Sequence, residues 1–216
     1  MRRLIATVLV LVAGAARAEA GSVDGTVTVT RPAGVEASSV LVYLVGFDEK
    51  PPKKRLTIKQ KKKRFWPSLV AITAGQAVDF PNGDAFLHNV FSPGSTRSFD
   101  LGSFPEGESR TRTFPDTGVV DVYCNIHPEM AATLVVLPNR RFTFADADGR
   151  FAIQGVPAGT WTLYAYSRRA RSPVSATVTV TAGTVSVDLA LEEVARDFKH
   201  ANKYGEAYRD EGATYR

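Results

Sequence analysis

Short runs rich in β-branched and aromatic residues, separated by turn-forming clusters, fill residues 55 to 138. The runs are RLTIKQ, WPSLVAIT, QAVDFPN, LHNVFS, SFDLG, ESRTRTF, GVVDVYCN and ATLVVLP. Turn chemistry such as TAG, PNGD, SPGS, PEGE and PDTG lies between them. Eight short strands at this spacing predict an all-β fold, and specifically a Greek-key sandwich.

Two more groups of strand signals flank this segment. GSVDGTVTVT alternates valine with polar residues from Val23 to Thr30, and SSVLVYLVGF reads as a more fully buried strand. After Pro138, FTFADADGRFAIQGVPAGTWTLYAYS and VSATVTVTAGTVSVDLAL predict strands joined by tight turns. The polar end, from residue 192 to 216, has weak helical spacing. It predicts a short helix and then a loose tail, with His200 solvated.

The first twenty residues have the features of an export signal. MRR is a basic start, LIATVLVLVAGAA is apolar, and ARA or AEA provides a small-residue cleavage site. The apolar stretch is short for a bilayer span, although an uncleaved membrane anchor is the alternative. We therefore expect a periplasmic or otherwise exported protein, without stable membrane insertion after cleavage.

Export also changes the charge balance. Removal of residues 1–20 takes the 27 basic residues to 24 and the 22 acidic residues to 21, so the net charge falls from +5 to +3. So small an excess gives no reason to expect nucleic acid as a partner. The basic charge is local, because PKKRLTIKQKKKR, residues 52 to 64, holds eight basic residues and no acid. This stretch predicts either a docking site for an acidic partner or a merely solvated hairpin.

The segment VYCNIHPEM, residues 122 to 130, collects the only cysteine, one of three histidines and one of two methionines. Cys124, His127 and Met130 follow the spacing C-x2-H-x2-M on one loop between two predicted strands. His88 lies at a predicted strand edge upstream. Two imidazoles and a thiolate with a weak axial methionine form the ligand set of an electron-transfer copper site. We predict one type 1 copper ion bound by His88, Cys124, His127 and Met130.

Each of these residues also has a structural explanation when taken alone. A lone cysteine at a strand end is usually a small buried hydrophobe, the methionine could fill the core, and the loop histidine could be ordinary. The clustering of scarce residues at ligand spacing favours the metal. A single cysteine in an exported chain also excludes an internal disulfide, which leaves an intermolecular, free or ligating role.

The segments HNVFS, FDLG and YCNIHPEM resemble the plastocyanin and amicyanin branch of the cupredoxins, over roughly residues 54 to 138. The wider pattern also resembles plastocyanin-like proteins grouped with methylamine utilisation. The resemblance implies that Asn89, after the first ligand histidine, steadies the two ligand loops. It also implies that electrons pass through His127. Pro93, Pro128 and Phe86 are candidates for an apolar docking surface around it.

The flanks resemble a carboxypeptidase regulatory-like, or transthyretin-like, β-sandwich. VDGTVTV and SVLVYLVG match its first half, and ADADGRFAIQGVPAGTWTLYAYS matches its second. We expect a signal at 1–20, the first strands of that sandwich at 21–52, an inserted cupredoxin domain at 53–139, the remaining strands at 140–191 and a polar tail at 192–216. Residues 21 to 50 could instead extend the cupredoxin. Asp146 and Asp148 favour an Asx-type turn over a cation loop.

These features predict a non-enzymatic one-electron carrier that serves a redox protein such as a cytochrome c or a dehydrogenase. The alternative is a copper-delivery or interaction module of the cell envelope without an electron-transfer role. A copper oxidase or nitrite reductase fits poorly, because Cys124 is flanked by Tyr123 and Asn125 where such enzymes commonly place histidine. Three histidines are also too few for a second, catalytic copper.

Overall fold

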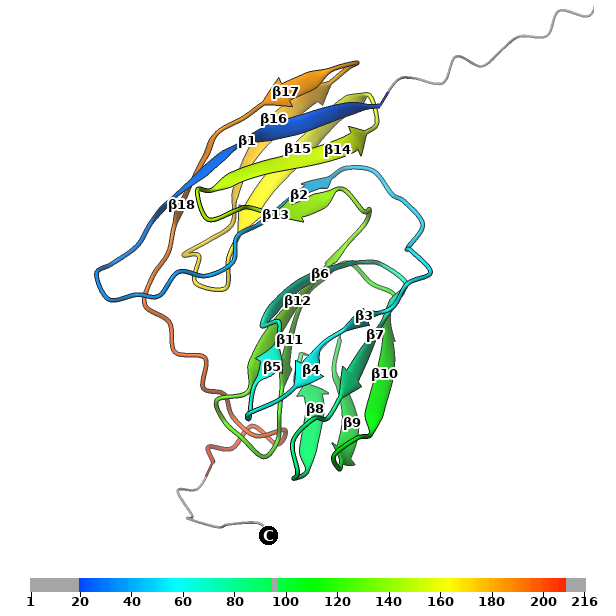
Figure 1. The fold of residues 1–216 in the computed structure, drawn as a ribbon, viewed down its shortest axis with the longest axis vertical. Helices are drawn as coiled ribbons and strands as arrows, with labels where there is room; N and C mark the ends of the chain where they lie inside the picture. Colours follow the sequence, from blue (N-terminus) through cyan, green and yellow to red (C-terminus); the bar gives the residue numbers. More distant parts are fainter. Residues whose placement is uncertain (1–19, 95–96, 209–216) are drawn as a thin grey trace, which may run out of the picture.

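The computed structural model describes residues 20–94 and 97–208 (Figure 1). Within these ranges the chain forms strands and no helix, so the all-β prediction is confirmed. It follows that the described ranges hold no helix that could cross a bilayer. The predicted signal, residues 1–20, lies outside them except for its last residue. The strands form two sandwiches, one above the other in Figure 1.

The lower sandwich contains the predicted strand series. A five-stranded sheet has the order β6-β12-β11-β8-β9 and faces a three-stranded sheet with the order β10-β7-β3; β4 and β5 form a hairpin. The bounds are β3 (Leu56–Thr57), β4 (Lys59–Gln60), β5 (Phe65–Trp66), β6 (Leu69–Thr73), β7 (Gln76–Pro81), β8 (His88–Ser92), β9 (Phe99–Phe104), β10 (Ser109–Phe114), β11 (Gly118–Tyr123) and β12 (Ala131–Leu137).

All eight predicted runs contain strand, but the first run is divided. RLTIKQ forms both β3 and β4, because β3 pairs with β7 whereas β4 pairs with β5. Ile58, between them, is fully buried in the core. The change of partner at a buried residue explains why one run of sequence gives two short strands.

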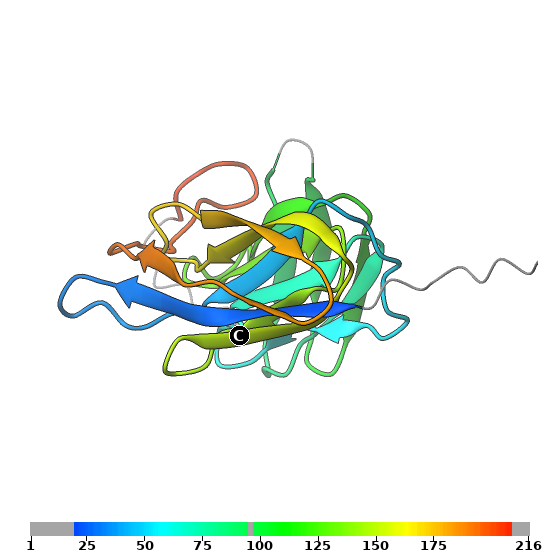
Figure 2. The same ribbon diagram turned by 90° about the horizontal axis from the view of Figure 1, so that it is seen from above.

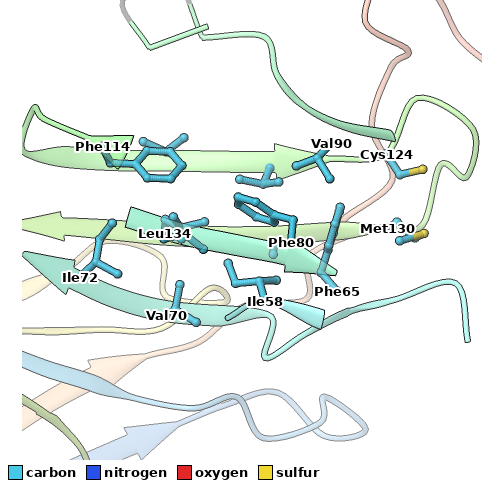
Figure 3. Close-up of a cluster of buried hydrophobic side chains, with 14 of the residues drawn as sticks. Ile58, Phe65, Val70, Ile72, Phe80, Val90, Phe114, Cys124, Met130 and Leu134 are labelled. Carbon is cyan, nitrogen blue, oxygen red and sulfur yellow. The ribbon is translucent and has the colours of Figure 1, made fainter. Parts of the chain in front are cut away.

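The core of the lower sandwich lies between its two sheets (Figure 3). Strand β7 alternates buried and half-buried residues, as expected of a strand with one face on a core. Strand β12 is buried along its whole length. Its residues Ala132, Leu134 and Val136 belong to the inner core, while Val135 and Leu137 pack in a separate cluster on the other face.

The upper sandwich is built from the two flanks. One sheet has the order β14-β1-β17, with β18 also on β1, and the other has the order β13-β2-β15-β16. The bounds are β1 (Gly21–Thr30), β2 (Leu41–Val45), β13 (Phe142–Phe144), β14 (Arg150–Val156), β15 (Gly159–Tyr166), β16 (Val174–Val180), β17 (Thr184–Ser186) and β18 (Leu189–Glu192). A second buried cluster, including Val23, Leu44 and Leu163, fills the space between these sheets.

The pairing joins segments far apart in the sequence. Strand β1 pairs with β14, β17 and β18, and β2 pairs with β13 and β15. In the described part of the chain, neither pairs with a strand of the lower sandwich. We propose on this basis that residues 53–139 are a unit inserted into the upper sandwich.

The chain enters and leaves the lower sandwich at adjacent points. The Asn139 side chain donates to the carbonyl oxygens of Leu44 and Phe47, both at 3.0 Å. Glu49 then binds Arg141 at 2.7 Å, and its amide donates to the carbonyl of Pro138 at 2.9 Å. These bonds tie the two connections together.

An apolar cluster joins the sandwiches directly. It contains buried Leu41 from the upper sandwich, buried Leu69, Ala71, Val135 and Leu137 from the lower one, and the half-buried Tyr43, Phe142 and Tyr166. Viewed from above, the two sandwiches overlap (Figure 2). Because the cluster packs residues of β6 and β12 against residues of β2, the sheet that carries β2 covers the outer face of β6 and β12.

Three expectations, one about a turn and two about the C-terminal tail, can be compared with the structure. The Asp146 carboxylate accepts the amides of Asp148 and Arg150, at 2.9 and 2.8 Å, which is the Asx-type turn predicted there. Residues 193–208 contain no helix and run down beside the lower sandwich to its far end (Figure 1). The expectation of a solvated His200 is wrong, because its ring stacks on Tyr123 with centroids 4.2 Å apart.

Candidate metal centre

The four predicted ligands lie at one end of the five-stranded sheet. His88 begins β8, Cys124 directly follows β11, and Met130 directly precedes β12. The connecting loop is closed by two bonds: the Cys124 amide donates to the Met130 carbonyl at 3.3 Å, and the Met130 amide donates to the His127 carbonyl at 3.1 Å. Antiparallel pairing of β11 with both β8 and β12 thus brings residues 36 positions apart to one place.

The donor atoms converge on one point. The Cys124 Sγ lies 3.8 Å from the Nδ1 of His88 and 3.7 Å from the Nδ1 of His127. All three atoms lie within 4.8 Å of one another. Met130 belongs to the same buried cluster as Cys124, and Figure 3 shows both sulfur atoms at the same end of that core. His88, Cys124, His127 and Met130 cluster in the manner of a type 1 copper site.

The donors differ in burial. His88, Cys124 and Met130 are fully buried, whereas His127 is half-buried. The two imidazole rings lie 5.0 Å apart. His127 is therefore the donor nearest to solvent, as the sequence resemblance implied.

The residue that orients His88 is Asp84, which was not among the site residues predicted from the sequence. The Asp84 carboxylate lies 2.9 Å from the Nε2 of His88. Burial lowers the pKa of His88, although the carboxylate acts in the opposite direction. A neutral His88 then carries its proton on Nε2, donates it to Asp84, and leaves the lone pair of Nδ1 facing Cys124. A carboxylate behind a ligating histidine is a common arrangement at metal sites.

Asp84 is itself held by the basic hairpin. The amides of Lys62 and Lys63 donate to its two oxygens at 2.8 and 2.9 Å. Both lysines have a φ of 53°, an unusual conformation for residues other than glycine. Burial would raise the pKa of Asp84, but the bonds from His88, Lys63 and Lys62 outweigh it and lower the value to about 2. Part of the basic stretch thus supports the site through backbone groups.

Cys124 is surrounded by backbone donors. Burial raises the pKa of its thiol, while the amides of Asn89, Ile126 and His127 act to lower it. The pKa of His127 is lowered by burial first, and then by His88 and Lys63. Neutral imidazoles and amides directed at sulfur suit a soft metal ion, which binds the thiolate and displaces its proton.

Asn89 connects the two ligand segments, as the resemblance implied. Its Oδ1 accepts the amide of Asn125 at 3.3 Å, and its Nδ2 donates to Asp100 at 2.7 Å. The Asn89 side chain thereby holds the loop that carries His127 in a fixed position relative to the strand that carries His88.

The surface around His127 is partly apolar. Phe86 is 39% exposed and Leu87 is 50% exposed, and the Phe86 ring lies 5.5 Å from that of His127. The ammonium of Lys63 lies 5.6 Å from the centre of the Phe86 ring. Pro128 is half-buried on the same loop. Pro93 follows the far end of β8, so it does not belong to this surface.

Scans against protein-family models and against curated proteins give no match. Solved structures similar to part of the chain include the Cu(I) form of an amicyanin mutant, with 17% identity over 44% of this chain and 97% of that one, and a TM-score of 0.37. Amicyanin from Paracoccus versutus has 24% identity over 44% of this chain and 96% of that one, with a TM-score of 0.37. A purple cupredoxin from Nitrosopumilus maritimus has 22% identity over 38% of this chain and 98% of that one, with a TM-score of 0.34. Each of these matches covers less than half of this chain, and none identifies the second sandwich. The metal-site assignment rests on the donor atoms described above.

Proposed function

We propose that the protein binds one copper ion through His88, Cys124, His127 and Met130 and acts as an exported one-electron carrier. The observation that supports this most directly is the approach of two imidazole Nδ1 atoms to within 3.8 Å of a single buried thiol. Copper bound there would supply a one-electron couple between Cu(II) and Cu(I). The thiolate and the two imidazoles would be the strong ligands, and Met130 the weak axial one.

The protein's contribution is to keep the ligands still. Asp84 fixes the His88 ring, Asn89 ties the two ligand segments together, and the core packs Cys124 and Met130. Rigid ligands favour electron transfer because little has to move when the charge on the metal changes. The three histidines of the chain leave no set for a second copper, which favours a carrier over an enzyme.

The docking face we propose consists of Phe86, Leu87, Pro128 and the edge of His127. Exposed Lys62 and Lys63 adjoin it through their contacts with Asp84 and Phe86, and exposed Lys61 and Arg64 flank them in the sequence. An apolar patch with a basic border suits an acidic redox protein, such as a cytochrome c or a dehydrogenase, that approaches by electrostatic steering. Residues 1–20 support a periplasmic location.

The test is a visible and EPR spectrum of the exported, purified protein after addition of Cu(II). An intense blue thiolate-to-copper band is expected, and Cys124→Ser should abolish it. His88→Gln and His127→Gln should lose it as well, while His200→Gln, the matched control outside the donor set, should keep it. A wild-type protein that stays colourless and binds Cu(II) weakly would refute the proposal.

Redox behaviour distinguishes the carrier from a copper-delivery module. A carrier cycles reversibly between its two states at an electrode without losing metal. A delivery protein gives up copper readily to a chelator, so rapid loss of Cu(I) from the wild type would favour the alternative.

A further inference from the structure

The segment after β18 runs from the upper sandwich down beside the lower one (Figure 1), and its end contacts the loop that carries the predicted ligands. It begins at Glu193, a fully buried carboxylate that binds Ser167 at 2.6 Å and Arg31 at 3.1 Å, both in the upper sandwich. The amide of Val194 then donates to the Arg169 carbonyl at 2.9 Å. The origin of the segment is thus fixed.

The middle of the segment runs along residues that follow β15. The guanidinium groups of Arg168 and Arg169 lie 4.0 and 5.2 Å from the centre of the Phe198 ring. Arg168 also donates to the Thr133 hydroxyl of β12 at 3.2 Å. These contacts direct the chain along the lower sandwich toward its ligand loop.

The end of the segment binds the ligand loop at three of its residues. The amide of His200 donates to the Pro128 carbonyl at 3.3 Å. The amide of Lys203 donates to the Asn125 side chain at 2.7 Å, and the Tyr208 hydroxyl donates to the carbonyl of Cys124 at 2.7 Å. The stacking of His200 on Tyr123 adds an aromatic contact beside the cysteine.

A further contact links the segment to the strand of the other histidine. One carboxylate oxygen of Asp100 accepts a hydrogen bond from the Asn89 side chain, and the other accepts one from the Lys203 ammonium, both at 2.7 Å. Asn89 in turn holds the Asn125 amide. Lys203 therefore binds both partners of Asn89, and it closes a ring of bonds around the two ligand segments.

We propose that residues 194–208 form a strap that holds the ligand loop closed and slows the release of the metal, with Tyr208 and His200 as positioning residues. The proposal rests on the copper site proposed above. In this arrangement, opening of the loop that carries Cys124 and His127 breaks the contacts that the strap makes with that loop, so the metal leaves more slowly while those contacts are intact. A hydrogen bond of ordinary net strength changes such an opening equilibrium by about 2- to 10-fold.

The experiment compares Tyr208→Phe with Tyr204→Phe in the full chain. Both changes remove one hydroxyl, but Tyr204 is 73% exposed. With the Cu(I) protein and an excess of a chromogenic Cu(I) chelator, Tyr208→Phe should release metal about 2- to 10-fold faster than wild type. Tyr204→Phe should match wild type. The double variant His200→Ala with Tyr208→Phe should be faster still, and all of these variants should keep the blue band.

A second measurement follows the strap without copper. In the apo-protein, amide exchange at Cys124, whose N–H is bonded to Met130, should quicken in Tyr208→Phe and not in Tyr204→Phe. Unchanged exchange and unchanged release in both Tyr208→Phe and the double variant would overturn the strap, even if the copper spectrum is as expected. A wild type without a thiolate band would instead refute the copper site, and amide exchange would still decide on the strap.

Discussion

Asp84→Asn tests the support of the metal centre by a buried carboxylate. The wild-type side chain accepts three hydrogen bonds, from Lys62, Lys63 and His88, at 2.8 to 2.9 Å. Asparagine keeps the shape but offers a single oxygen, so its amide group must face at least one of these donors. Hydrogen bonds to charged groups contribute about 1.5–3 kcal/mol each, so we expect a loss of about 2 kcal/mol in the free energy of unfolding.

The same change should weaken metal binding. Without the carboxylate the His88 ring is free to turn, and loss of such a partner typically lowers metal affinity by about 10- to 100-fold. Copper affinity by chelator competition and the unfolding temperature of the apo-protein measure the two effects. Asp116→Asn, at an exposed carboxylate in the turn before β11, is the matched control. Equal affinity and equal unfolding temperature in the two variants would show that Asp84 does not orient the ligand.

The pH dependence of this contribution has a definite sign. The pKa of Asp84 is about 2 in the folded state, below its ordinary value of 3.8. The stabilisation is therefore present above about pH 4 and is lost as the pH falls toward 2, because the unfolded chain takes up the proton first. Asp84→Asn should lack this acid-dependent part of the stability curve.

Three other outcomes are expected. Burial lowers the pKa values of His88 and His127 below 6.5, so protonation of these side chains should destabilise the folded apo-protein. The urea midpoint should therefore fall as the pH drops from 7 to 5, and it should fall by less in His88→Gln. An equal fall in the variant would show that His88 does not contribute to this pH dependence. Leu134→Ala should cost about 2–5 kcal/mol in unfolding free energy, against little for the half-exposed Val119→Ala, as thermal denaturation would show. If the basic stretch of residues 53–64 steers an acidic partner, the bimolecular electron-transfer rate should drop steeply with salt; rates that are flat with salt would argue against steering.

The sequence was informative where chemistry is local. Alternating valines and turn residues indicate strands, and Cys124, His127 and Met130 lie on a single loop, so their convergence follows from spacing alone. His88 could be added because a sandwich brings strand ends together. Asp84 carried a weaker signal, an acid four residues before His88 in a loop that also contains Asn82 and Gly83.

Other features depend on long-range contacts that no local pattern reveals. RLTIKQ is one run in sequence, but Ile58 is buried where the chain changes pairing partner. The helix predicted from the weak helical spacing after residue 192 is absent from residues 193–208. Contacts of His200, Lys203 and Tyr208 with the ligand loop and Tyr123 determine the path of that segment instead. The polar composition of this segment does not indicate which residues of the ligand loop it contacts.

The three crossings of the chain between the sandwiches limit how the molecule can move. Tandem domains joined by one linker swing about it, and they sample many orientations. Here the two connections next to Asn139 cross at one place, and the segment that starts at Glu193 crosses at another. Bending about the first crossing would stretch or compress the second. The orientation of His127 relative to the upper sandwich is therefore restricted, and the two ends of the molecule turn as one body.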